Sequence, residues 1–150
     1  MRNGALNRPS AASAPDDGRP AVYSRLWVFL GALNGLVSVA AGAYGRHGAL
    51  EPAGREMFTI ASQYQMTHGL ALLAVGWLAG GSALGGGRVL PNVAGIAFTL
   101  GIVLFCGSLY WFGINGLVPL QGSAPTGGIL LMAGWATLMA AAVRRIAARS

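Results

Sequence analysis

One long stretch decides the fold of this chain: Val89–Val143, with the sequence VLPNVAGIAFTLGIVLFCGSLYWFGINGLVPLQGSAPTGGILLMAGWATLMAAAV. It contains no Asp, Glu, Lys, Arg or His, and charge appears only outside it, at Arg88 and Arg144. A water-soluble domain rarely goes that far without a charge, because its loops face solvent. A helix that crosses a bilayer needs about 20 apolar residues to span roughly 30 Å of hydrocarbon. The stretch is therefore too long for one crossing and about right for two.

The stretch is interrupted where a helical hairpin would turn. Its two apolar halves, Val93–Ile114 and Thr126–Val143, are separated by residues that favour turns and loops. These residues are Asn115, Gly116, Pro119, Gln121, Gly122, Ser123 and Pro125. We therefore expect two transmembrane helices joined by a short uncharged turn.

The overall composition agrees with a membrane protein of one domain. Apolar residues make up 54% of the chain and charged residues 9%, against about a quarter charged in soluble proteins. The 24 glycines suit closely packed membrane helices. The net charge of +6 comes from arginines in the tail and at the ends of apolar segments, not from a basic patch, so we expect no nucleic-acid partner. The single cysteine, Cys106, excludes an internal disulfide.

Two more apolar runs precede the hairpin, at Leu26–Tyr44 and Phe58–Gly80. We expect an all-α integral membrane protein with four transmembrane helices in an up-down bundle over residues 24–147. Residues 1–23 form a polar tail with little to bury, which predicts disorder. Residues 45–57 mix both charge signs and are expected to form an exposed loop.

The distribution of arginine predicts the orientation. Four crossings place both chain ends and a Gly-rich link at 82–92 on one side of the membrane. The opposite side carries Arg46 and Arg55. The arginines of the first side are Arg2, Arg8, Arg19, Arg25, Arg88, Arg144, Arg145 and Arg149. Because arginine accumulates on the cytoplasmic side, we expect a multi-pass protein of the inner (plasma) membrane with both termini in the cytoplasm.

The first apolar run leaves a second interpretation open. With Arg25 before it and Ala41-Gly42-Ala43 at its end, it resembles a secretory signal with a cleavage site. The run is longer than the usual signal core of about 7–15 residues, and further apolar runs follow it. We favour a helix that stays in the protein.

The polar first half of the run Phe58–Gly80 contains the strongest site candidates. On a 3.6-residue period, Tyr64, Gln65 and His68 share one stripe, flanked by Ala61 and Leu72. Polar groups in hydrocarbon need partners, so this stripe should face other helices. The candidate intramembrane polar cluster comprises Asn34, Ser38, Gln63, Tyr64, Gln65 and His68.

His68 would lie about 15 Å into the membrane if its helix begins at Phe58 and rises about 1.5 Å per residue. An ionisable residue at such depth raises a functional hypothesis by default. We favour a structural role, in which a neutral His68 bridges Tyr64 or Asn34 and fixes helix register. A proton relay or ligand contact remains the alternative.

The predicted loop contributes a second candidate, His47, for which pairing with Glu51 and contact with a lipid headgroup are alternatives. We favour a solvated loop histidine. Two histidines alone do not complete a tetrahedral zinc site. Bis-histidine haem ligation needs both residues at one depth, whereas His47 is predicted to lie at the interface and His68 deeper. We therefore expect no metal site and no cofactor.

No catalytic constellation accompanies the potential nucleophiles Cys106 and Ser108, because no base or carboxylate shares their segment. Phosphate-loop, dinucleotide-binding and zinc-protease motifs are also missing from the sequence. We do not expect an enzyme. Thr126 is a candidate N-cap of the last helix. The glycines expected to allow close helix packing are Gly31, Gly35, Gly42, Gly107, Gly127 and Gly128.

Several short motifs, taken in order, resemble a known family. They are Gly42-Ala43-Tyr44-Gly45-Arg46-His47, Gln63-Tyr64-Gln65 with His68, Phe105-Cys106-Gly107-Ser108-Leu109-Tyr110, Pro125-Thr126-Gly127-Gly128 and Ala133-Gly134-Trp135. Over about Leu26 to Arg145 the set resembles the small membrane proteins grouped as domain of unknown function 423, the YgdD and transmembrane protein 256 family. That family usually has Ala at the position of Arg46. The resemblance implies a four-helix membrane protein, argues against cleavage after the first helix, and supplies no activity.

Three hypotheses for function follow. The first is a structural or accessory helix bundle in the lipid bilayer that self-associates or joins a larger membrane complex. The second is a small oligomeric transporter or channel component with a polar path around His68. The third is a haem- or quinone-binding membrane subunit.

Overall fold

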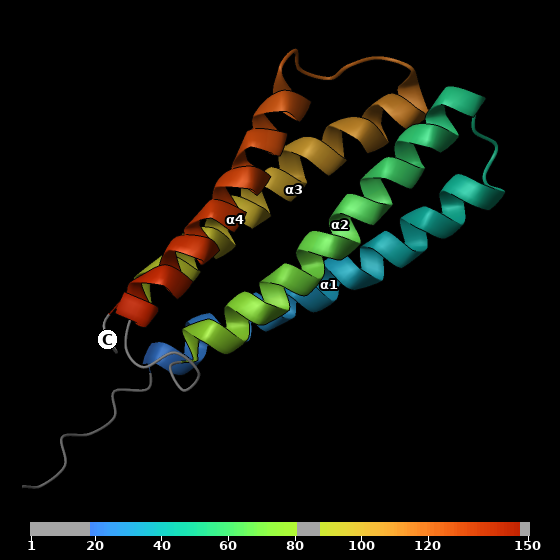
Figure 1. Cartoon of the computed structure of the whole chain (residues 1–150). Coiled ribbons are helices and arrows are strands. Elements are labelled where there is room, and N and C mark those ends of the chain that lie inside the picture. The colour runs from blue at the N-terminus through green and yellow to red at the C-terminus, as the bar shows by residue number, and fades with distance from the viewer. Residues whose placement is uncertain (1–18, 81–87, 148–150) are drawn as a thin grey trace, which may run out of the picture.

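The computed structural model describes residues 19–80 and 88–147, which form four helices joined by short connections. They are α1 (Arg19–His47), α2 (Pro52–Ala79), α3 (Val89–Asn115) and α4 (Ser123–Ala147). Consecutive helices run antiparallel, so the start of α1 and the end of α4 lie at the same end of the molecule (Figure 1). The expectation of an all-α protein is confirmed.

Three of the described helices are long and apolar enough to cross a membrane. They are α1 over Val22–His47, α3 over Val89–Asn115 and α4 over Ser123–Arg144. The helix α2 has the length, at 28 residues, but its first half is polar and lowers its hydropathy. The structure therefore supports three of the four expected spans by length and composition.

The helices pack in chain order, α1 on α2, α2 on α3 and α3 on α4. Two helical hairpins, α1–α2 and α3–α4, thus lie side by side (Figure 1). The contact of α1 with α3 is slight, and includes a hydrogen bond of 2.7 Å from the Trp27 indole N–H to Asn92 Oδ1. Each helix therefore packs mainly on the helices next to it in the chain, and the four described helices do not form a closed bundle.

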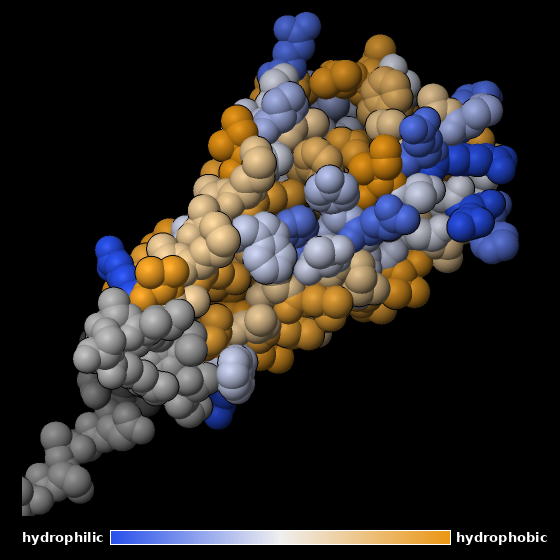
Figure 2. Space-filling model, viewed as in Figure 1, coloured by the Kyte–Doolittle hydropathy of each residue, from blue (hydrophilic) through white to orange (hydrophobic). Residues whose placement is uncertain are grey.

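The core lies where α2 and α3 face each other and their partners, and it includes Leu72, Val75, Phe98, Ile102 and Cys106. Large apolar side chains also cover the outer faces of α1, α3 and α4, and much of the side surface is apolar (Figure 2). An outside as apolar as the inside is what hydrocarbon surroundings require.

The connection between α1 and α2 is shorter than predicted. The exposed loop expected at 45–57 shrinks to residues 48–51, because α1 continues to His47 and α2 begins at Pro52. Proline suits the first helical position, since its missing N–H would have no helical partner there. At the other end α1 begins at Arg19, before the expected domain start at residue 24; residues 1–18 of the predicted tail lie outside the described residues.

The second hairpin also begins and ends differently from the prediction. The N-cap assignment of Thr126 is wrong, because α4 begins at Ser123 and the Thr126 N–H already bonds to the Gly122 carbonyl at 3.0 Å. Gly116 (φ 67°) and Gly122 (φ 83°) flank the turn in the left-handed region that favours glycine. In the link expected at 82–92, α3 begins at Val89, and residues 82–87 lie outside the described residues.

Candidate functional site

A chain of side-chain hydrogen bonds joins three helices at mid-length. Tyr110 Oη of α3 donates to Gln65 Oε1 of α2 at 2.8 Å. Gln65 Nε2 in turn donates to Asn34 Oδ1 of α1 at 2.9 Å, and Asn34 Nδ2 donates to the carbonyl of Leu30 at 2.8 Å. Gln65 is buried, with 6% of its surface exposed. Both ends of its amide are therefore used inside the protein, and the network fixes the register of α1, α2 and α3.

His68 joins α2 to α4. The Trp135 indole N–H donates to His68 Nε2 at 3.1 Å, and His68 Nδ1 donates to the Tyr64 carbonyl at 2.7 Å. These partners assign the proton to Nδ1 and the lone pair to Nε2, which is a neutral imidazole. The expected bridge from His68 to Asn34 is wrong, because Asn34 pairs with Gln65 instead. The contact of His68 with Tyr64 is through the backbone carbonyl.

The other members of the predicted cluster occupy different environments. Ser38 is buried, and its hydroxyl donates to the Gly35 carbonyl at 2.8 Å. Tyr64 is 46% exposed, and its ring lies 4.8 Å from that of Phe105. Gln63 is exposed on the outer face of α2, away from Gln65. The six residues therefore do not form one cluster: Asn34, Gln65 and His68 point inward, whereas Gln63 points outward.

The outer face of α2 is polar along its first half. Glu56, Thr59, Gln63 and Thr67 recur every three or four residues and are all exposed; we call them the α2 polar stripe. Blue and pale surface extends from one end of the molecule into the middle of an otherwise apolar face (Figure 2). A helix surface that faces lipid is normally apolar, so this stripe is the surface least suited to hydrocarbon.

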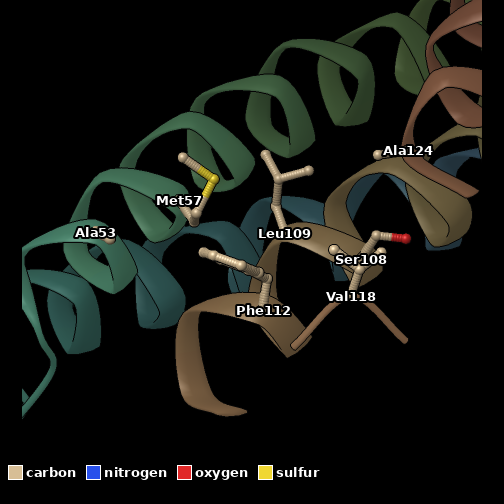
Figure 3. A pocket seen from close by; sticks show the side chains of 7 residues that line it. All are labelled: Ala53, Met57, Ser108, Leu109, Phe112, Val118 and Ala124. Atoms are coloured by element: carbon tan, nitrogen blue, oxygen red, sulfur yellow. The ribbon is translucent and has the colours of Figure 1, made fainter. Parts of the chain in front are cut away.

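Among the cavities on the described surface, two lie beside candidate residues of the sequence analysis, His68 and Ser108. The first, of about 390 Å³, lies beside His68 and Trp135 and is also lined by Tyr64, Phe105 and Leu131. The second, of about 430 Å³, lies between the start of α2, the end of α3 and the start of α4. Figure 3 shows the residues that line the second cavity, Ala53, Met57, Ser108, Leu109, Phe112, Val118 and Ala124. Its lining is almost wholly apolar and offers little for chemistry.

The loop candidates His47 and Glu51 are both exposed. His47 is the last residue of α1, and Glu51 is the N-cap of α2 but forms no side-chain capping bond. No hydrogen bond joins these two described residues. Within the described ranges 19–80 and 88–147, no three side chains of His, Cys, Asp or Glu gather as a metal site would need.

Ser108 and Cys106 are buried in α3, and neither lies next to a general base. Ser108 Oγ is 2.6 Å from Ser123 Oγ, and Ser123 Oγ donates to the Leu120 carbonyl at 2.7 Å. These bonds tie the end of α3 to the start of α4. Cys106, 1% exposed, is part of the apolar core. The structure gives both residues packing roles.

Only some of the expected packing glycines lie at close helix contacts. A Cβ at Gly31 would lie 2.7 Å from Leu73 Cδ2 and 2.8 Å from the Gly69 carbonyl, and one at Gly127 would meet the backbone of Phe105. Gly42 and Gly128 have ordinary contacts with α2 and α3. A Cβ at Gly35 or Gly107 would meet nothing within 4 Å, so neither position needs a glycine for the contacts inside this chain.

Other glycines that sequence reasoning missed lie at close contacts. A Cβ at Gly54 would meet the Gly113 backbone, one at Gly101 would meet Leu131, and one at Gly134 would meet Phe98. A glycine count alone does not distinguish these positions from open ones, because the decision depends on how each helix is rotated about its axis.

The fold and site define a helical membrane protein whose interior polar groups bond both within and across helices. Comparison with known proteins agrees: the family described as a protein of unknown function, DUF423, matches residues 41–128. A UPF0382 membrane protein of Staphylococcus epidermidis is 35% identical over 123 residues, which cover 80% of this chain and 97% of the relative. YwdK, a UPF0382 membrane protein of Bacillus subtilis, is 34% identical over 123 residues, with 80% and 98% covered.

The chain therefore belongs to the DUF423 family of uncharacterised membrane proteins, as the ordered motifs predict. A further UPF0382 membrane protein, from Staphylococcus aureus strain bovine RF122, is 36% identical over 120 residues, which cover 78% of this chain and 94% of the relative. No solved structure matches this chain.

Proposed function

We propose that this protein is a four-span accessory protein of the inner membrane, which acts by associating with itself or with a larger membrane complex. The observation that carries the proposal is the α2 polar stripe. Thr59, Gln63 and Thr67 are exposed on the single chain, on a helix that we place in the bilayer. The two threonine hydroxyls bond within the helix, but the Gln63 amide forms no hydrogen bond to a described residue. Polar groups in hydrocarbon require partners, so we expect another membrane protein to cover this face.

The packing of α2 supports its placement as the fourth span. It contacts α1 at Gly31 and Gly69, and the Ser24 hydroxyl donates to the Gly76 carbonyl at 2.7 Å. On its other side the Phe58 ring lies 4.9 Å from that of Tyr110 in α3. A helix packed along its length between two candidate spans shares their depth. The residues from Glu56 to Ala79 rise about 35 Å, enough to cross the hydrocarbon.

Four spans also determine the sidedness that we propose. The helix ends near Arg25, Arg88 and Arg144 would face the cytoplasm, and the α1–α2 connection would face outward. The excess of arginine in and near the cytoplasmic segments supports this orientation.

The interior polar groups support an accessory role more than catalysis. Gln65 and His68 each use their side-chain donor and acceptor on protein partners. Because Nε2 of His68 accepts the Trp135 bond, a haem iron or a metal ion would have to displace Trp135. This geometry favours a non-enzymatic scaffold without a cofactor over the haem-binding alternative.

A transport role is the second candidate, and one observation favours it. The α2 polar stripe leads from the end that carries Arg55 and Glu56 toward the cavity beside His68. In an oligomer such a stripe could line a polar path. Flux through reconstituted vesicles that His68→Ala leaves unchanged would remove this candidate.

Site-specific photo-crosslinking tests the association function. A benzophenone amino acid replaces Thr67, exposed in the stripe, in one variant and Val103 in the other; Val103 is 64% exposed on the apolar face of α3. In native membranes we expect protein adducts from position 67 and mainly lipid adducts from position 103. Lipid adducts alone at both positions would contradict the proposal.

A further inference from the structure

We infer that the partner covering the α2 polar stripe is a second copy of this chain, packed α2 against α2 about a two-fold axis beside Gln63. This inference rests on the proposed association function and names the partner. It depends on three features of α2: the spacing of its outer residues, the hydrogen bonds that its exposed threonines form within the helix, and the Gln63 amide, which forms none.

The outer face of α2 has a regular row that runs most of its length. Glu56, Gln63, Leu70 and Trp77 recur every seven residues, and Leu70 and Trp77 are 58% and 64% exposed. Beside this row lie the smaller residues Thr67 and Ala74, also exposed. Rows repeating at seven residues, with small neighbours, allow two helices to pack side by side at a crossing angle of about 20°.

The threonines of the stripe are satisfied within their own helix. Thr59 Oγ1 donates to the Arg55 carbonyl at 2.9 Å, and Thr67 Oγ1 donates to the Gln63 carbonyl at 2.9 Å. These two threonines can face either lipid or another helix, because their hydroxyl groups are already hydrogen-bonded. Of the uncharged polar groups in the stripe, only the Gln63 side-chain amide therefore requires a partner outside the chain.

The Gln63 side-chain amide forms no hydrogen bond to any residue that the structure describes. It lies seven residues, about 10 Å along the axis, inward from Glu56, and so within the hydrocarbon if Glu56 marks the interface. An amide without a hydrogen-bond partner is unfavourable at that depth, because hydrocarbon offers no water to replace the missing bonds. Its partner must supply both an acceptor and a donor.

A second copy meets that requirement without any further residue. A carboxamide carries both a donor and an acceptor, and a two-fold contact places the same surface of each chain against the other. Two Gln63 amides on the axis can therefore satisfy each other. At the water end of the row, Glu56 is adjacent to Arg55, so this end of the interface carries both charge signs.

Cysteine crosslinking in native membranes tests the inference. The test variant is Leu70→Cys, which lies in the same row, is 58% exposed and keeps Gln63. Val39→Cys on α1 and Val103→Cys on α3 are the controls, since these valines are 62% and 64% exposed. The native Cys106 is buried and does not compete. A disulfide needs Cα atoms about 4.4–6.8 Å apart. We therefore expect a covalent dimer at position 70, roughly tenfold above the controls, because this variant keeps the Gln63 amides, whose interhelical hydrogen bonds contribute about that factor.

A second pair of variants separates the amide from the packing. Gln63 has no partner within the described chain, so Gln63→Leu leaves the fold of the single chain intact. We expect the dimer fraction, measured by native mass spectrometry from lipid nanodiscs, to fall roughly tenfold in Gln63→Leu and to be largely kept in Gln63→Asn. Equal dimer fractions in the wild type, Gln63→Leu and Gln63→Asn would contradict a role for the Gln63 amide in dimerisation.

The outcomes distinguish this inference from the function on which it rests. Crosslinking at Leu70→Cys no stronger than at Val39→Cys or Val103→Cys would show that the partner is not a second copy. If the benzophenone at position 67 then captures a different membrane protein, association stands and only the identity of the partner is wrong. If it captures lipid alone, both proposals fail.

Discussion

The indole N–H of Trp135 in α4 donates to Nε2 of His68 in α2, with 3.1 Å between the two nitrogens. This bond connects the last helix, which packs mainly on α3, to the first hairpin. Tryptophan in membrane proteins is usually found at the interface, and Trp135 lies near the middle of its helix. Its position is explained by the bond to His68.

Replacing Trp135 with phenylalanine should loosen α4. The Trp135→Phe variant keeps most of the ring but leaves His68 Nε2 without its donor. We expect a loss of about 0.6–1.7 kcal/mol in the free energy of unfolding, the range for interhelical hydrogen bonds in membranes. Reversible unfolding in mixed micelles measures it, with Trp111→Phe as the control, because Trp111 is 53% exposed. Equal effects of both changes would contradict the role of the bond.

Replacing Gln65 should destabilise the monomer, whereas replacing Gln63, two residues away, should not. Gln65→Leu removes the centre of the Asn34–Gln65–Tyr110 network and leaves two partners unpaired, so we expect a loss of about 1–3 kcal/mol in the unfolding free energy of the monomer. Gln63→Leu should leave that quantity within about 0.5 kcal/mol of the wild type. Unfolding at high detergent-to-protein ratio, where the chain is monomeric, makes the comparison. A Gln63→Leu loss as large as that of Gln65→Leu would show that our assignment of inner and outer faces is wrong.

The glycines of the second hairpin offer a similar contrast. Gly127→Ala places a methyl group against the Phe105 backbone and should destabilise the protein by about 1–3 kcal/mol. Gly107→Ala adds a methyl group to open space and should be neutral or slightly stabilising, since alanine favours the helix. Thermal unfolding in detergent compares the two variants. Equal melting temperatures would contradict the close approach of α3 and α4 at Gly127.

Topology mapping should give an even number of crossings. A fluorescent protein fused after Ser150 should fluoresce, because it folds in the cytoplasm, and alkaline phosphatase at that position should be inactive. A cysteine at Glu51 in the α1–α2 connection should react with a membrane-impermeant maleimide added outside the cells. An active phosphatase at the C-terminus would mean three crossings and would place α2 outside the bilayer core.

The hydrophobic pattern predicts the number and type of the helices well, because four long, mainly apolar segments can be recognised in the sequence alone. It places their ends less well. Charged residues such as Arg46 and Arg55 suggest loop, yet both are helical, since the ends of membrane helices extend into the polar interface, where charge is tolerated. The true connection is marked by Gly48 and Pro52.

The candidate site is predictable only where polar residues show which side of a helix faces inward. In α2 the stripe with Gln65 and His68 points inward, and both are buried, at 6% and 5% exposed. In α3 nearly every residue is apolar, so periodicity carries little information about rotation. That is why Tyr110 as the third member of the network, and Gly101 instead of Gly107 as a packing position, could not be predicted.

The most direct test of the central claim, that protein covers the α2 polar stripe within the membrane, is the collision accessibility of a spin label at position 67 in liposomes, a position that keeps Gln63. Oxygen concentrates in lipid and a nickel chelate in water, so protein cover excludes both. We predict low accessibility to both reagents at position 67, and high oxygen accessibility for the same label at position 103. Oxygen accessibility at position 67 equal to that at position 103 would mean that the stripe faces lipid, and high nickel accessibility would mean that it faces water; either result would contradict the account.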